Sequence, residues 1–280
     1  MTPFASACIN EYSFIFWPVW KCQKGETDVK MESALISPAK AMLLGLPAKI
    51  IFIIIPLLGI GIFTYIIIRR FLPLRSAAPD PRFDRISERV ASVFKYWLGQ
   101  FRHPRYMLPG IMHILLFSGF IILSIRSLTL VFIGIIDGFV LPGLGGGLGV
   151  AYAVIKDIAG SFVLVAVIVL MIRRGLFKPA RYAVPPRYGK EHTAEAIFVL
   201  CLITGLVVCD MVFEGSLAAA RHISGSETEF ILPGTGTWMA AHLLGAIPVD
   251  TLQRLHLGAY FLHEVIFFFF LCFLPLGKHC

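Results

Sequence analysis

The chain has 280 residues, of which 57% are hydrophobic and only 15% are charged; its mean hydropathy is +0.79. A soluble domain carries about 25% charged residues, so this composition excludes a soluble globular enzyme, a disordered protein and a collagen-like fibre. The length would allow two soluble domains, but the apolar content indicates helices that cross a bilayer. We therefore expect a membrane protein.

Five apolar runs have the length of about 20 residues that a transmembrane helix needs. They are too long for strands, and their apolar residues do not alternate with polar ones. These runs predict an all-α membrane protein whose five-transmembrane-helix bundle occupies residues 45–280, after an N-terminal extracytoplasmic segment at residues 1–44. The predicted spans cover about residues 49–68, 108–133, 153–172, 194–213 and 255–274.

The segments between the spans differ sharply in positive charge. Residues 69–107 hold nine lysines and arginines and residues 173–190 hold six, whereas residues 134–152 hold none. By the positive-inside rule, the two basic segments lie in the cytoplasm. This predicts an N-terminus outside and a C-terminus in the cytoplasm, in the inner membrane of a bacterium or archaeon. Four lysines in the first forty residues run mildly against it.

The net charge of +8 resides largely in those basic blocks between apolar runs. That distribution favours a membrane protein over a nucleic-acid-binding one. Residues 83–100 predict an amphipathic helix on the cytoplasmic membrane surface. The glycine-rich residues 143–149 lack the ending of a nucleotide-binding loop and predict a flexible external loop. Residues 238–248, which include His242, are apolar enough for a short interfacial helix.

The six cysteines form no CxxC pair, so the chain shows no zinc or iron–sulfur motif of its own. Cys201, Cys209 and Cys272 fall in apolar runs, where we expect small buried hydrophobic residues.

The eight histidines are the most informative residues. His192 and His222 fall in predicted loops, but five others gather on two spans: His103 and His113 on the second, and His256, His263 and His279 on the fifth. An ionisable side chain at membrane depth is a candidate for function. Histidines on two helices are also what bis-histidine ligation of haem requires, because one imidazole must approach the iron from each side.

Depth along the helices suggests which histidines pair. At a rise of about 1.5 Å per residue, His113 lies about 13–15 Å from the start of its helix and His263 about 18 Å from Pro275. These depths match each other better than either matches His256, which is roughly 10 Å farther out. His113 and His263 are therefore the first predicted haem pair. His103 and His279, at the cytoplasmic edge, form a second and weaker pair.

The spacing of His103 and His113 and the ending HEVIFFFFLCFLPLGKH resemble the gamma subunit of respiratory nitrate reductase, a five-span dihaem cytochrome b. The run GIMHILLFSGFIILSI is similar to the cytochrome module at the N-terminus of membrane-bound Fe–S oxidoreductases related to heterodisulfide reductase. The resemblance covers about residues 45–280. It departs from the gamma-subunit pattern at His279, because that pattern would place the last ligand at position 281, after the final residue, Cys280.

The resemblance implies a membrane electron-transfer cytochrome b that passes electrons between a cytoplasmic iron–sulfur partner or domain and the quinone pool. Haem b would be its cofactor, quinone its substrate and membrane lipid its surroundings. Arg126, near the outer end of the second span, is suited to bind a haem propionate, and snorkelling to the interface explains it equally well. The alternative is a multi-pass transporter or non-haem scaffold, although the odd span number and the lack of repeats count against a typical transporter.

Overall fold

The computed structural model describes residues 9–11, 19–21, 35–43, 45–78, 83–177, 193–226 and 230–276. The chain divides into two units, residues 1–33 and 34–280. In the first unit, β1 (Ile9–Glu11) pairs antiparallel with β2 (Val19–Lys21). The second unit holds the helices and all the residues discussed below.

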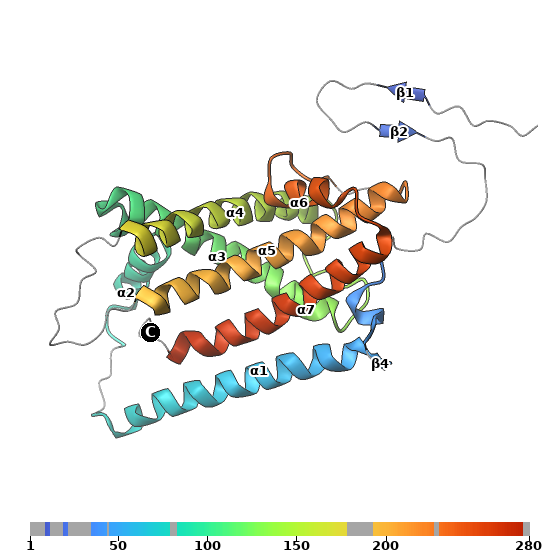
Figure 1. Cartoon of the computed structure of the whole chain (residues 1–280). Coiled ribbons are helices and arrows are strands. Elements are labelled where there is room, and N and C mark those ends of the chain that lie inside the picture. The colour runs from blue at the N-terminus through green and yellow to red at the C-terminus, as the bar shows by residue number, and fades with distance from the viewer. Residues whose placement is uncertain are drawn as a thin grey trace, which may run out of the picture. The chain divides into compact units, whose positions relative to one another are not determined.

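Five long helices dominate the second unit and confirm the predicted all-α, five-span fold. Each is long and apolar enough to cross a membrane, and they run alongside one another in Figure 1. They are α1 (Ala48–Phe71), α3 (Met107–Ile133), α4 (Gly146–Ile172), α5 (Thr193–Ile223) and α7 (Val249–Phe273).

Short elements join and flank these helices. The predicted amphipathic segment is helical as α2 (Ile86–Ser92) and a π-helical turn, η3 (Val93–Leu98), and the predicted short helix containing His242 is α6 (Gly236–Leu244). The remaining elements are η1 (Pro38–Lys40), β3 (Met42–Leu43), β4 (Leu46–Pro47), η2 (Leu72–Ser76), η4 (His103–Arg105), η5 (Arg173–Phe177) and η8 (Leu274–Leu276).

Two helices are longer than the hydropathy pattern predicts. The glycine-rich segment is not a loop throughout, because α4 already begins at Gly146, where a positive φ of 58° turns the chain into the helix. Helix α5 continues about ten residues past its apolar run, to Ile223. Its extra turns contain Ser216, Ala219 and Ala220, which are small residues buried in the bundle.

Small residues let the long helices approach closely, as is typical of membrane bundles. A Cβ added at Gly119 of α3 would overlap the side chain of Val163 on α4, and one added at Gly59 of α1 would overlap Phe268 on α7. Helix α5 lies between α4 and α7 (Figure 1) and contacts both. The bundle therefore places α3, α4, α5 and α7 around a common interior.

Contacts near both ends fix the relative heights of the helices. The hydroxyl of Tyr260 on α7 donates to the carbonyl of Leu130 on α3 at 2.9 Å, and Arg70 at the end of α1 bonds the carbonyl of Pro275. We call the end of the bundle that carries Arg69, Arg70, Arg173 and Arg174 the basic end, and the end that carries α6 the opposite end.

At the opposite end, residues 35–43 fold back over the bundle. Lys40 pairs with Asp137 at 2.6 Å, Ser37 donates to the same carboxylate at 2.5 Å, and Gln253 accepts from the Ile36 amide at 2.6 Å. The hydrogen bonds from Lys40 and Ser37 hold the pKa of the Asp137 carboxyl below its usual range. The chain before α1 is thus tied to the loop that follows α3.

Candidate functional site

A pocket of about 90 Å³ lies inside the bundle, between α3, α4, α5 and α7. Apolar side chains form most of its wall, among them Leu116, Phe120, Val163, Phe267 and Phe270. Phe120 is also 53% exposed, so neighbouring side chains do not enclose this wall of the pocket. The pocket is therefore an apolar chamber at membrane depth.

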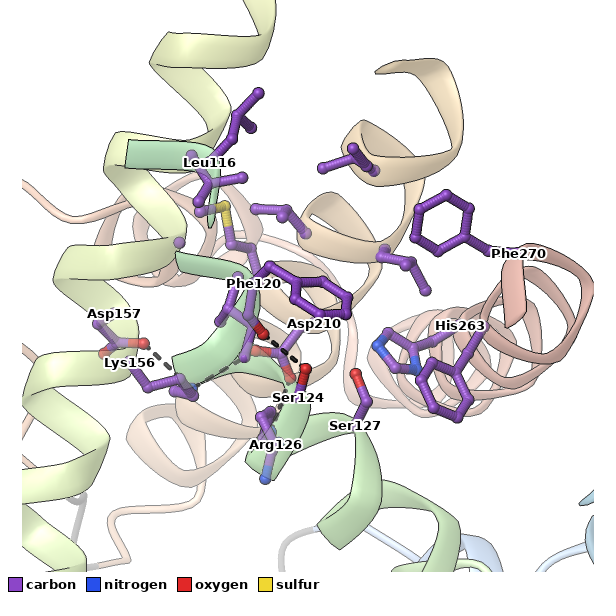
Figure 2. Close-up of a pocket in the computed structure, with 18 of the residues that line it drawn as sticks. Leu116, Phe120, Ser124, Arg126, Ser127, Lys156, Asp157, Asp210, His263 and Phe270 are labelled. Atoms are coloured by element: carbon purple, nitrogen blue, oxygen red, sulfur yellow. Dashed lines mark hydrogen bonds and ion pairs between the residues drawn. The ribbon is translucent and has the colours of Figure 1, made fainter. Parts of the chain in front are cut away.

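One side of this chamber is polar. His263 of α7 lies next to Ser127 of α3, and Arg126 and Asp210 lie beyond them, as Figure 2 shows. The polar residues of the wall come from five helices, α3, α4, α5, α6 and α7. Donors and charges thus face an otherwise apolar chamber, which is how pockets fix the orientation of a small molecule.

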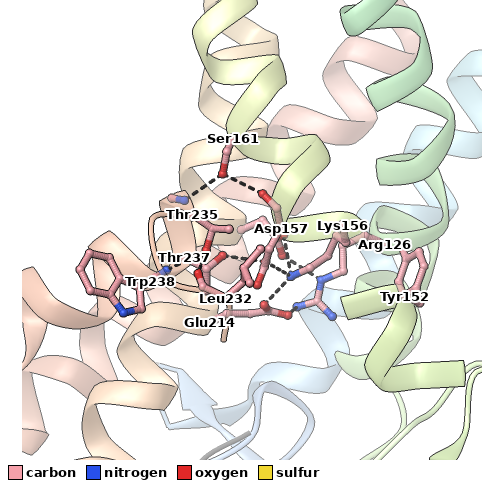
Figure 3. A network of polar contacts seen from close by, with 12 residues as sticks. Arg126, Tyr152, Lys156, Asp157, Ser161, Glu214, Leu232, Thr235, Thr237 and Trp238 are labelled. Carbon is pink, nitrogen blue, oxygen red and sulfur yellow. Dashed lines mark hydrogen bonds and ion pairs between the residues drawn. The ribbon is translucent and has the colours of Figure 1, made fainter. Parts of the chain in front are cut away.

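The polar side rests on five charged residues that we call the charged cluster: Arg126, Lys156, Asp157, Asp210 and Glu214. Arg126 donates through Nε to Asp210 at 2.8 Å and through Nη2 to Glu214 at 2.7 Å. Lys156 lies 3.1 Å from Asp157 and 3.6 Å from Asp210, and it also bonds Glu214. Figure 3 shows Arg126, Lys156, Asp157 and Glu214 converging from α3, α4 and α5.

Helix α6 closes the charged cluster on the side toward the opposite end. The Thr237 hydroxyl donates to Asp157 at 2.9 Å, and the Gly236 amide donates to the Ser161 hydroxyl at 2.9 Å. The Thr235 hydroxyl caps α6 by accepting from the Trp238 amide. These bonds fix the short helix against α4 and shield the Asp157 carboxylate, whose side chain is only 6% exposed.

His263 is buried where α7 faces the pocket, with 3% of the residue exposed. Its Nδ1 has no hydrogen-bond partner and lies 3.6 Å from Oε1 of the neighbouring Glu264. Both oxygens of Glu264, which is 1% exposed, also lack hydrogen-bond partners. Buried polar groups are nearly always satisfied, so an orphaned pair marks a place where a further molecule or proton belongs.

His103 and His113 lie together near the basic end, in η4 and α3. Their rings stack with centroids 4.3 Å apart and an interplanar angle of 19°. His113 is an exposed residue and neither ring lines the pocket. The fourth predicted ligand, His279, lies outside the described residues. The structure therefore brings the two histidines of the second span together, and it does not bring His113 to His263.

The register of α3 against α7 explains this separation. His263 follows Tyr260, which bonds Leu130, and it shares the pocket with Ser127. Ser127 and His113 are fourteen positions apart on α3, or about 21 Å at the helical rise. Two axial imidazoles must reach one iron from its two faces. As they lie here, His113 and His263 do not fit one porphyrin, and the predicted haem pairing stays a prediction.

Arg126 does not take the interfacial role considered for it, and its role at a haem propionate stays a prediction. It is 12% exposed and bound to two carboxylates, so it does not snorkel to the interface. Its carboxylate partners, Asp210 and Glu214, are the site residues that the sequence interpretation missed. Their spacing of four residues in an apolar run is a usable signal, because it places two acids on one face of a transmembrane helix.

Two further histidines lie close to this region without entering the pocket. His256 is buried on α7, where Nδ1 donates to the Phe213 carbonyl at 2.8 Å and the ring stacks on Phe213 with centroids 4.0 Å apart. His242 packs against Trp238 on α6. In the part of the chain that the structure describes, no three or more His, Cys, Asp or Glu side chains are arranged to hold a metal ion.

Comparison with known proteins gives one informative similarity. Over 201 residues the chain is 26% identical to a protein named EtfAB:quinone oxidoreductase from Syntrophomonas wolfei. The match covers 70% of this chain but only 27% of that protein, so the chain corresponds to about a quarter of a much longer polypeptide. No family model matches the chain, and no solved structure does. The similarity points to quinone-linked oxidoreductases as the class of its relatives.

Proposed function

We propose that the chain is the membrane module of a quinone-linked oxidoreductase and that the headgroup of a quinone binds in the central pocket. The observation that carries this proposal is the pocket itself, an apolar chamber at membrane depth with hydrogen-bonding groups on one side. A quinone has matching chemistry, because it is a flat apolar ring with two carbonyl acceptors and a lipid-soluble tail. The name of the Syntrophomonas wolfei relative supports the same substrate.

Different residues of the pocket are suited to bind the ring and the carbonyl groups of such a headgroup. The aromatic rings of Phe120, Phe267 and Phe270 offer surfaces for the quinone ring. Ser127 and His263 are the donors suited to its carbonyls, because the charges of Arg126 and Lys156 are already engaged by carboxylates. Most of the surrounding wall is apolar, and a hydrogen bond in such surroundings is stronger than one in water.

The electron partner completes the proposal. We propose that electrons pass between the quinone and a cytoplasmic iron–sulfur protein or domain that docks at the basic end, in a bacterial or archaeal inner membrane. The match covers only 27% of the relative, and the larger remaining part of that protein is consistent with a further electron-transfer part. The family resemblance adds a b-type haem, which would supply one-electron transfer when bound. Because His113 and His263 lie far apart here, no step of this proposal runs through that haem.

A binding measurement tests the quinone site. Purified protein in detergent should bind 1,4-naphthoquinone in an equilibrium titration. Ser127→Ala and His263→Ala should each weaken binding about fivefold to tenfold, the value of one hydrogen bond. His242→Ala, outside the pocket, is the matched control and should leave the affinity unchanged. Failure of the wild-type protein to bind would contradict the site. Acid-labile sulfide in gently purified complexes would support the iron–sulfur partner.

The transporter alternative has one observation in its favour, the buried charges of the charged cluster. Ion pairs at membrane depth mark transport pathways as well as redox sites. A transporter would show no quinone binding and no redox spectrum. The titration therefore separates the two functions.

A further inference from the structure

Close helix packing bounds the central pocket on two of its sides. Between α3 and α4, a Cβ added at Gly119 would overlap the side chain of Val163. Between α5 and α7, a Cβ added at Gly205 would lie 2.9 Å from the side chain of Ile266. Both glycines mark places where two helices already touch, so neither interface leaves room for a ligand to pass at that level.

The pocket is also bounded toward the opposite end of the bundle. There the hydroxyl of Tyr260 joins α7 to the carbonyl of Leu130 on α3 at 2.9 Å, three residues beyond Ser127. Helix α6 covers α4 on the same side, through the hydrogen bond from Thr237 to Asp157. A ligand that reaches Ser127 therefore meets a closed part of the pocket, which we call the floor.

The side between α3 and α7 differs from these. Phe120 lines the pocket there and is nevertheless 53% exposed, so the pocket meets the surface at this residue. Ser124 lies on the same face of α3 and donates its hydroxyl proton to the Phe120 carbonyl at 2.6 Å, within its own helix. Figure 2 shows both across the pocket from His263 and Phe270 of α7. We call the opening lined by Phe120, Ser124 and Phe267 the lateral mouth.

The floor and the lateral mouth differ in chemistry. On α3, Phe120 precedes Ser127 by seven residues, or about 10 Å at the helical rise. Helix α7 runs in the reverse direction, so Phe267 and Phe270 lie nearer the basic end than His263 does. On both helices the hydrogen-bonding groups thus lie toward the floor and the aromatic rings toward the basic end. A ring whose carbonyl accepts from Ser127 or His263 would turn its other edge to the lateral mouth.

We propose that a quinone with a polyprenyl tail binds with its ring toward the floor and its tail in the lateral mouth, where Phe120 determines which tails fit. This rests on the quinone site proposed above. The tail stays among the lipid chains while the ring enters between α3 and α7, so the substrate never has to cross water. The substrates of the site are therefore lipid-resident, tailed quinones, and Phe120 is a specificity-determining residue.

A pair of ligands tests the lateral mouth. The ligands 2-methyl-1,4-naphthoquinone and its 3-geranyl derivative share a headgroup and differ in the tail. Phe120→Trp adds bulk at the mouth, so it should weaken binding of the geranyl derivative about tenfold more than binding of the tailless ligand, the effect of overpacking one contact. Equilibrium titrations of wild type and variant in one detergent give this ratio, because partition of the tail into micelles then cancels.

The matched control is Ile125→Trp on the same helix. Ile125 is 39% exposed and does not line the pocket. The same bulk added there should leave the ratio of the two affinities unchanged.

A photoreactive ligand locates the tail in the wild-type protein. A 1,4-naphthoquinone with a diazirine in the first carbons of its tail should label α3 near Phe120 and α7 near Phe267. Excess 2-methyl-1,4-naphthoquinone should prevent this labelling, because the headgroups compete for one site. Ile203 and Val207 of α5, on another wall of the pocket, should stay unlabelled. Mass spectrometry of the peptides gives the result even if Phe120→Trp fails to fold.

The outcomes separate this inference from the function on which it rests. If both ligands bind and Phe120→Trp changes their affinities by the same factor, the lateral mouth is refuted and the quinone site stands. Labelling confined to α5, or labelling of α3 that the excess ligand does not prevent, would likewise overturn the route of the tail. If neither ligand binds the wild-type protein, both the site and the lateral mouth are refuted.

Discussion

At the scale of single residues, the membrane interior makes charge pairing the dominant constraint. An unpaired charge there costs several kcal/mol, and Arg126 and Lys156 avoid this cost by sharing three carboxylates. Such clusters contribute little net stability, because desolvation offsets much of the attraction. The retention of five charges beside a pocket is therefore better explained by chemistry in the pocket than by stability.

The histidines give a residue-scale prediction about haem binding. If a b-type haem binds near the basic end, His113→Ala should abolish its reduced α-band, because an axial ligand is lost. His263→Ala should keep that band, since Ser127, which shares the pocket with His263, lies about 21 Å along α3 from His113. A reduced-minus-oxidised spectrum of each purified variant is the measurement.

Two outcomes would contradict this expectation. Loss of the band in both variants would support the His113–His263 pairing that the sequence predicts and would require the bundle to rearrange around the haem. Absence of an α-band from the wild-type protein would contradict haem binding altogether. His222→Ala, at the far end of α5, is the control that should leave the spectrum unchanged.

The sequence reveals the individual polar residues better than their partners. Arg126, Lys156 and His263 stand out because they interrupt apolar runs. Their partners depend on the register between helices, which contacts such as Tyr260 with Leu130 determine. The depth of a histidine counted from the predicted end of its own helix does not give this register. Helix α3 begins at Met107 and α7 ends at Phe273, and these two ends need not lie at the same height in the bundle. Hence the fold was predictable, and the pairing of residues across helices was not.

At the scale of elements, glycines determine how closely the helices pack. The carbonyl of Gly59 on α1 accepts a hydrogen bond from Cys272 of α7 at 3.3 Å. Its missing side chain leaves room for Phe268 of the same helix. Two residues along α1, a Cβ at Gly61 would meet nothing within 4 Å. Helix α1 therefore has two glycines with the same helix propensity, one packed against α7 and one with open space beside it.

This contrast gives an element-scale prediction. Gly59→Leu should separate α1 from α7 and destabilise the bundle by about 1–3 kcal/mol, the usual effect of overpacking. Gly61→Leu is the matched control, and it should be neutral or slightly stabilising because leucine favours the helix more than glycine does. Thermal unfolding of the two variants in the same detergent is the measurement. Equal midpoints for both would contradict close packing of α1 on α7.

At the scale of the whole molecule, the candidate sites lie at different depths of the bundle. The stacked His103 and His113 lie near the basic end, whereas the polar side of the pocket, at Ser127 and His263, lies about 21 Å farther along α3. If the basic end faces the cytoplasm, the quinone headgroup would bind in the outer half of the membrane. Electrons from a cytoplasmic partner would then cross much of the bilayer before reaching it, so the orientation of the bundle decides how far they travel.

Orientation gives the last prediction. The positive charges of the basic end predict that it faces the cytoplasm. Single cysteines at two exposed positions should therefore react differently with a membrane-impermeant maleimide, in a background whose native cysteines are replaced. Gly145→Cys, in the loop before α4, should be labelled in intact cells, whereas Ser76→Cys, after α1, should be labelled only once the membrane is permeabilised. The reverse pattern would invert the bundle and place the quinone pocket in the cytoplasmic half. Labelling of both positions in intact cells would show leaky cells, which a cytosolic marker protein controls for.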